Sequence, residues 1–308
     1  MPTDKPRPQT VTALVRAATA APSLHNAQPW RFRYTRDSAL FQIRAALDRC
    51  LPHSDPHGRA LHMGCGAALL NLRVAAAHAG WRPVTRLLPD PHDPRLLATV
   101  RLERADGDPD LAALHPAIRR RRTSRLPFSE KRVADPVRAA LREAAESEGA
   151  QLHYPSAWHV RTVLDLVHDA EGRDHADPGR AAELAEWTDP ERTPDGHDFA
   201  GRMTPAERTP GESPFEQEPQ LALLGTAEDR PTDWLRAGQA MERVLLVATR
   251  RGVSAGLSSA PVDWSDARWA DRDPMSPMGQ VHVVLRLGYG PRAPATPRRP
   301  VAQVLQVE

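Results

Sequence analysis

The chain has 308 residues, enough to bury one large core or two smaller ones. Its 41 basic and 39 acidic side chains leave a formal net charge of +2, so charge gives no reason to expect nucleic acid or an anionic membrane as a partner. There are only two cysteines, and the sequence has neither a signal peptide nor a stretch of ~20 apolar residues. These features predict a soluble cytoplasmic protein.

The first elements are a helix and a hairpin. Apolar residues at helical spacing between positions 11 and 18 predict a helix that ends near Pro22. Apolar and arginine residues alternate between positions 30 and 34, and a second alternation runs between positions 41 and 47. This pattern predicts two half-buried strands that form a hairpin.

A long apolar stripe follows between positions 61 and 76. It predicts a helix that ends at Gly80, and its many small residues would let a second helix approach closely. Residues 97–102 predict another strand.

The next stretch is mainly helical. We expect a short helix over residues 111–120 and further helices around residues 137–144 and 160–167. Residues 171–219 are rich in proline and charge and lack periodicity. A stretch of that length without regular structure is usually a functional lid or a disordered linker.

Regular structure returns with a predicted strand at residues 221–224 and a helix at residues 235–246 that is stopped by Gly252. Alternation over residues 281–287 predicts a last strand. The tail, residues 297–308, begins extended and is apolar enough to dock. Helices and strands mixed in this way predict an α+β fold of layered sheets and helices, and the order strand, helix pair, strand occurs twice.

Two motifs carry the functional signal. The loop that ends in Trp30 presents His25, Asn26 and Gln28. Far downstream, residues 121–125 read Arg-Arg-Thr-Ser-Arg and offer guanidinium and hydroxyl donors suited to a phosphate. The amide side chains suit the carbonyls and imide of a pyrimidine edge, and Pro29 with Trp30 could wall a planar ring. Together the motifs predict a flavin mononucleotide (FMN) site.

Plainer interpretations stand beside these. The arginine run could be a solvated helix end, since nearly all basic residues of this chain are arginine, and the amides could cap backbone groups in a turn. His53, His57 and His62, with Asp48 and Asp55 nearby, match neither a zinc finger nor a His-Glu-x-x-His helix, so we expect a polar helix entry and no metal. Ser258 and Ser259 lack the surroundings of a hydrolase nucleophile.

The two motifs, with supporting strings at residues 234–243, 252–261 and 287–300, resemble the nitroreductase superfamily. Its members carry an Arg-x-Ser-type phosphate motif and a Pro-Ser-x-x-Asn-x-Gln-Pro-Trp loop. Here the arginine motif follows the loop, and Thr123 stands where serine is usual. The reversed order resembles the Acg-like branch of actinobacteria, in which one chain contains two nitroreductase-like halves.

The resemblance implies a nitroreductase-like α+β fold with two related halves, residues 1–110 and 111–308, each a mostly antiparallel sheet flanked by helices. Residues 171–219 would form a lid. The implied cofactor-binding residues are Arg121, Arg122, Thr123 and Arg125 for the phosphate and ribityl chain, His25, Asn26 and Gln28 for the loop, Ser258, Ser259, Ala260 and Pro261 along the isoalloxazine, and Arg298 or Arg299 as a late basic contact.

The implied activity is FMN-dependent oxidoreduction of the nitroreductase type. NAD(P)H would reduce the flavin, which would reduce a nitro, quinone or similar small-molecule acceptor, and no protein side chain would act as the catalyst. The alternatives are a flavin-storage protein without turnover and a flavin-dependent dehydrogenase of a natural-product pathway. The protein would be a monomeric pseudo-dimer or a homodimer.

Overall fold

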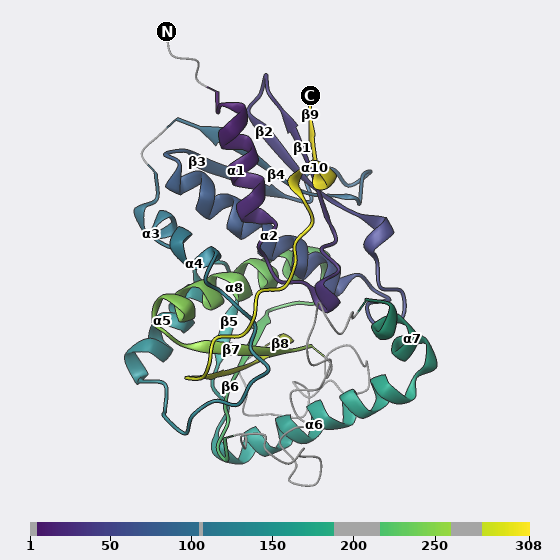
Figure 1. The fold of residues 1–308 in the computed structure, drawn as a ribbon, viewed down its shortest axis with the longest axis vertical. Helices are drawn as coiled ribbons and strands as arrows, with labels where there is room; N and C mark the ends of the chain where they lie inside the picture. Colours follow the sequence, from purple (N-terminus) through teal and green to yellow (C-terminus); the bar gives the residue numbers. More distant parts are fainter. Residues whose placement is uncertain (1–4, 105–106, 188–215, 260–278) are drawn as a thin grey trace.

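Two β-sheets lie on opposite sides of two long central helices (Figure 1). The computed structural model describes residues 5–104, 107–187, 216–259 and 279–308. The central helices are α2, Arg59–His78, and α8, Pro231–Arg250. This arrangement is the α+β layering that the sequence predicts.

The first sheet has the strand order β3-β4-β2-β1-β9. Its strands are β1 (Trp30–Thr35), β2 (Leu40–Ala45), β3 (Arg82–Leu87), β4 (Leu96–Glu103) and β9 (Leu305–Val307). The predicted hairpin is confirmed, with Trp30 paired to Ala45. The tail docks as β9, which pairs in parallel with β1. Helices α1 (Pro8–Ala18) and α2 pack with the apolar side chains of this sheet in one hydrophobic core.

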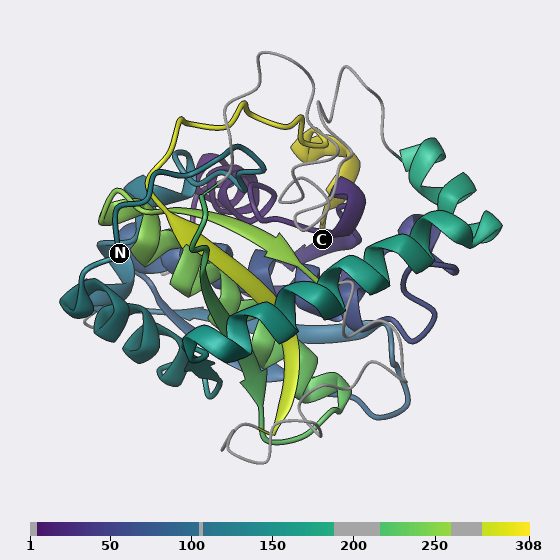
Figure 2. The same ribbon diagram turned by 90° about the horizontal axis from the view of Figure 1, so that it is seen from below.

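The second sheet has the order β5-β6-β8-β7, and all its neighbours are antiparallel. Its strands are β5 (Gln151–His153), β6 (Gln220–Thr226), β7 (Ser254–Ser258) and β8 (Gln280–Gly288). Successive residues of β6 join different cores: Ala222 and Leu224 pack in the core that contains α8, whereas Leu221 and Leu223 pack with α6. The sheet therefore lies between α8 and α6, Ala157–Ala176, which crosses its outer side in Figure 2.

Short elements connect these layers. They are the 3-10 turns η1 (Leu24–Asn26) and η2 (Leu47–Arg49) and the helices α3 (Pro109–Ala112), α4 (His115–Ile118), α5 (Asp135–Glu146), α7 (Pro178–Trp187) and α10 (Val301–Val304).

Two expectations about helices need correction. Where the sequence predicts a single helix over residues 111–120, the structure has two short helices, α3 and α4. A second helix begins at α4 because Pro116 lies in its first turn, where the missing N–H of proline costs nothing. The segment 171–219 was expected to lack regular structure, yet its first part is helical: it completes α6 and forms α7. Residues 188–215 of the expected lid lie outside the described residues.

The two central helices touch backbone to backbone. A Cβ atom on Gly66 would lie 2.3 Å from the carbonyl oxygen of Leu235, and one on Gly238 would lie 2.1 Å from that of Met63. Both distances are far below a normal contact, so each helix needs glycine where the other crosses it. The predicted close approach of a second helix is confirmed.

Helix α2 is also long and apolar enough to cross a membrane by length and composition alone. In this structure 83% of its most apolar window is buried inside the protein, between the first sheet and α8. The apolar composition of α2 is therefore explained by its position in the core, because the helix contacts other elements on several sides.

Replacing Gly238 with alanine should force α2 and α8 apart and lower the free energy of unfolding by about 1–3 kcal/mol or more, as overpacked cores do. Urea unfolding would measure the change. The matched control is Gly172→Ala in α6, where, among the residues the structure describes, no atom beyond the helix's own neighbouring residues lies within 4 Å of the added Cβ. There alanine should stabilise the protein by roughly 0.5–1 kcal/mol. Equal effects at the two positions would contradict this account of the helix contact.

Candidate functional site

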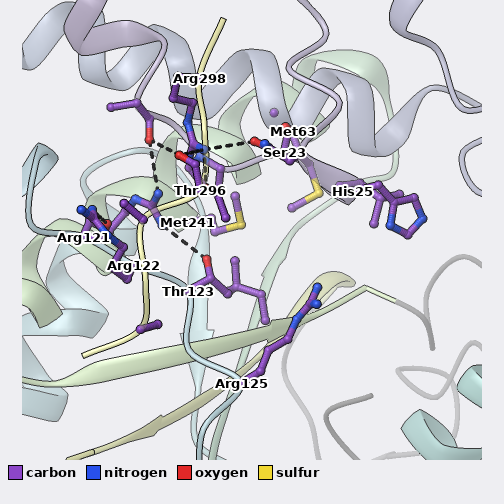
Figure 3. Close-up of a pocket in the computed structure, with 18 of the residues that line it drawn as sticks. Ser23, His25, Met63, Arg121, Arg122, Thr123, Arg125, Met241, Thr296 and Arg298 are labelled. Carbon is purple, nitrogen blue, oxygen red and sulfur yellow. Dashed lines mark hydrogen bonds between the residues drawn. The ribbon is translucent and has the colours of Figure 1, made fainter. Parts of the chain in front are cut away.

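A cavity of about 610 Å³ opens between the loop that precedes β1, the two central helices, the edge of the second sheet and the tail. That volume is in the range of small-molecule and cofactor sites. Of the residues predicted for the site, the cavity is lined by His25, Asn26, Arg121, Arg122, Thr123, Arg125, Ser259 and Arg298. Segments that lie far apart in the sequence therefore meet around one space (Figure 3).

Three guanidinium groups gather at one end of the cavity: those of Arg121, Arg122 and Arg298 (Figure 3). Arg121 is only 4% exposed and donates to the Ala20 carbonyl at 3.2 Å and to the Thr123 hydroxyl at 3.3 Å. Arg298 donates to the same carbonyl at 3.3 Å. The Nε atom of each of the three arginines is buried without a hydrogen-bond partner in the described structure.

This clustering is electrostatically unfavourable. Burial, together with the charges of Arg121 and Arg122, lowers the pKa of Arg298 to about 10, and the Glu242 carboxylate opposes that shift. Burial and the nearby Arg292 and Arg121 also lower the pKa of Arg122. An anion bound among these groups would relieve their mutual repulsion.

Glu242 lies beneath the arginine cluster on α8 and is completely buried. Its Oε1 atom lies 3.5 Å from Nε of Arg121. Burial raises the pKa of Glu242 to about 7, against the opposing effects of Arg121, the Asn71 amide and Arg298. Glu242 has no signal in the sequence, because an acidic residue on an amphipathic helix is usually on its solvated face.

The arginine segment is fixed on both sides. The backbone N–H of Ser124 donates to the carbonyl of Ala255 in β7 at 2.8 Å. On the other side of the segment, Arg286 of β8 donates to the Leu126 carbonyl at 2.8 Å. The same guanidinium pairs with the buried Glu216 carboxylate at 2.9 Å. The orientation of the arginines therefore depends on the second sheet.

Arg125 does not join the other three arginines. Figure 3 shows its side chain directed away from them, toward the side of the cavity where His25 lies. The electrostatic effect of Arg125 on His25 agrees with this placement. Burial, followed by the charges of Arg125 and Arg180 against that of Glu183, lowers the pKa of His25 to about 4, so its ring is neutral near pH 7.

The loop before β1 has an unusual backbone. His25, Asn26 and Gln28 have φ values of 47°, 55° and 53°, in the left-handed region that residues other than glycine seldom adopt. The tail helps to hold this conformation. Asn26 donates to the Pro297 carbonyl at 3.1 Å and accepts from Arg298 at 3.1 Å. Strained residues that their surroundings hold in place often mark binding sites.

Gln28 is part of the same connection but not of the cavity lining. It is 4% exposed, accepts from the Arg299 backbone N–H at 2.8 Å and donates to the Asn26 carbonyl at 3.2 Å. Its amide is thus occupied in joining loop to tail. Trp30 is fully buried in the core of the first sheet, and the Arg299 side chain points to the Gln28 carbonyl at 3.4 Å.

The remaining predicted residues fall in three places. Ser259 lines the cavity, Ser258 ends β7 without lining it, and Ala260 and Pro261 lie outside the described residues. Among the described residues no three metal-binding side chains cluster together. His53 is one of the histidines considered above for a metal. Its backbone N–H donates to the Glu183 carboxylate at 3.2 Å.

Several lining residues had no signal in the sequence. Met63 of α2 and Met241 of α8 place their sulfur atoms between the arginine cluster and His25 (Figure 3). Leu257, Val283 and residues 293–296 complete the wall. Their apolar character fits a core as well as a cavity, so only the tertiary structure distinguishes the two.

Gln28→Ala should loosen the tail, because it leaves the half-buried Asn26 carbonyl and Arg299 N–H without their partner, at a cost of about 1–3 kcal/mol. Hydrogen exchange of the amides of residues 299–308 should accelerate. Gln42→Ala in β2, where the side chain makes only a 3.4 Å contact with Arg44, is the control and should change stability by roughly 0.5 kcal/mol or less. Unchanged exchange in the Gln28 variant would contradict its connecting role.

Comparison with known proteins agrees with this architecture. The family model described as "Nitroreductase family" matches residues 118–289, more than half of the chain. A Mycobacterium tuberculosis protein named "putative NAD(P)H nitroreductase" is 33% identical over 99% of this chain and 94% of its own length. Another from that organism, named "putative NAD(P)H nitroreductase acg", is 31% identical over 96% of this chain and 95% of its own.

Structural comparison adds the fold. The crystal structure of a "putative nitroreductase" from Anabaena variabilis covers 92% of this chain and 88% of its own with a TM-score of 0.53, at 10% sequence identity. The nitroreductase-like fold expected from the two motifs is confirmed. Family match, full-length relatives and fold agree, and the chain belongs to the nitroreductase family.

Proposed function

We propose that the cavity binds FMN and that the protein is an NAD(P)H-dependent flavin oxidoreductase. The observation that carries the proposal is the group of three mutually repelling arginines, each with a buried Nε atom, at one end of a largely apolar cavity. The printed names of the mycobacterial relatives support NAD(P)H as the electron donor.

The donor set fits a phosphate. Arg121, Arg122 and Arg298 offer several N–H groups, and the Thr123 hydroxyl lies beside Arg121. A dianionic phosphate would offset most of the positive charge that these groups share, and charge-assisted contacts of this kind are stronger than neutral ones. The buried Nε atoms without partners indicate that the cluster is not satisfied by the protein alone.

The rest of the cavity fits a planar, mostly apolar ring. Met63, Met241, Leu257 and Val283 supply apolar surface from both central helices and the second sheet. Ser23, Asn26 and Ser259 add polar groups at its boundary. A large apolar pocket with a few polar groups is the usual form of a cofactor site.

When bound, FMN would supply hydride and electron transfer that no side chain of the chain provides. The protein's own residues would bind and orient: the arginines hold the phosphate, the methionines limit water, and the strained loop sets the position of His25. Because His25 stays neutral near pH 7, it can donate one hydrogen bond without adding a charge.

Further parts of the proposal concern the reaction and its setting. The acceptor would be a nitro, quinone or similar small molecule, and the protein would act in the cytoplasm. The two halves, residues 1–110 and 111–308, would replace the two subunits of a dimer. The described structure supports this in one respect: the cavity takes residues from both halves, with His25 from the first and Arg122 from the second.

An absorption spectrum of the purified protein tests the proposal first. We expect the two visible bands of a bound flavin, and we expect NADPH or NADH to bleach them in the absence of air. A colourless protein that takes up no added FMN would refute the cofactor assignment. Bound flavin that dithionite reduces but neither nicotinamide reduces would instead support a storage protein or a dehydrogenase with another electron donor.

Arg298→Met should weaken FMN binding roughly 10- to 150-fold, since a charge-assisted hydrogen bond contributes about 1.5–3 kcal/mol. Titration of FMN fluorescence would measure the dissociation constant. Arg299→Met is the matched control, because the neighbouring side chain lies outside the cavity lining and should change affinity by less than about threefold. Similar losses in the two variants would argue against a specific phosphate contact from Arg298.

A further inference from the structure

The carboxyl group of Glu242 and a bound phosphate would compete for the same cations. Glu242 is 0% exposed, and its Oε1 atom lies 3.5 Å from Nε of Arg121, which is 4% exposed. Neither carboxylate oxygen accepts a hydrogen bond of normal geometry within the described structure. The carboxylate is therefore stabilised mainly by the nearby charge of Arg121, followed by the Asn71 amide and the charge of Arg298.

Three elements packed around α8 supply the groups that face this carboxyl. They are Arg121 from the segment after α4, Asn71 from α2 and Arg298 from the tail. All three favour the ionised form of Glu242, whereas burial disfavours it and raises its pKa to about 7. Near neutral pH the carboxyl is thus poised between its two protonation states.

A phosphate would remove the support for the ionised form. Arg121 and Arg298 line the cavity and also stabilise the Glu242 carboxylate. A dianion bound to them would offset their charge and repel a second anion in the same low-dielectric region. The protonated form of Glu242 would then be favoured, and because a phosphate dianion brings no proton of its own, solvent supplies it.

We propose that Glu242 takes up a proton from solvent when a phosphate dianion binds to Arg121, Arg122 and Arg298. The carboxylate becomes a carboxylic acid, no other bond is made or broken, and the site exchanges an internal counter-ion for the charge of its ligand. Glu242 is therefore a positioning residue that acts through the arginines. This inference rests on the proposed function, because it takes FMN as the phosphate ligand.

The consequence is a pH-dependent affinity. A ligand that prefers the protonated protein binds more weakly as pH rises above the pKa of the free protein, by up to about tenfold per pH unit for one proton. The useful window is pH 7–9. There the phosphate monoester, with a second pKa of about 6, is a dianion, and Arg298, with its pKa near 10, keeps its charge.

Calorimetric titration of the flavin-free, full-length protein with FMN at pH 8 tests the proposal directly. Runs in two buffers of different ionisation enthalpy give the number of protons exchanged on binding. We expect uptake of about half to one proton per FMN in the unmodified protein. E242Q should bind FMN with little or no proton uptake and with an affinity that is nearly constant between pH 7 and 9.

The matched control is E146Q, which removes an exposed carboxylate of α5 and should leave the proton uptake unchanged. If FMN binds the unmodified protein without proton uptake, the inference is overturned while the proposed cofactor stands. If FMN does not bind at all, both fail. Should E242Q not fold, the proton count of the unmodified protein still decides the question.

Discussion

The backbone contact between α2 and α8 is the constraint on which the rest of this structure depends. Each helix contributes a glycine where the other crosses, and each carries a neighbouring methionine into the cavity. The first sheet packs with α2 and the second with α8, so this one crossing fixes how the two sheets face each other. A cavity between them keeps its shape only while the helices stay at that short distance.

The chemistry of the site follows from a charge imbalance that the fold creates. Buried guanidinium groups are usually paired, yet Arg121 and Arg298 share one buried carboxylate whose own ionisation is costly, and Arg122 adds a third positive charge beside them. The excess positive charge is held in place by contacts with backbone carbonyls rather than neutralised. Such a site gains most from an anionic ligand, which is why the electrostatics favour a phosphate-bearing cofactor over an uncharged one.

Much of the fold was predictable from periodicity, because the alternating strands and apolar helices bury one face each. Besides β9 in the docking tail, three strands carry no clear signal in the sequence, for physical reasons. β3 is an edge strand in which four of six residues, Pro83 among them, are arginine, threonine or proline; β5 has three residues, and β7 consists mostly of small residues. None of these shows a clear apolar alternation, and each depends on a neighbouring strand for its conformation.

The site was predicted in outline from two motifs, and the family resemblance named most of its polar residues. The sequence gives no sign of which motif residues face the cavity. The Gln28 side chain bonds the tail instead of lining the cavity, and Arg125 lies apart from the other arginines. Sequence patterns do not identify Met63, Met241 and Glu242 as site residues. On a helix, a side chain that faces a cavity and one that faces the core occur at the same spacing along the sequence.

The parallel pairing of β9 with β1 has a consequence for biosynthesis. Phe32 pairs with Leu305, and Asn26 bonds Arg298 across 272 positions of sequence. The amino-terminal sheet therefore keeps an open edge, and its neighbouring loop stays unanchored, until the ribosome has released residue 307. The cavity, which Arg298 of the tail lines, is therefore complete only after these late residues have been synthesised and have left the exit tunnel.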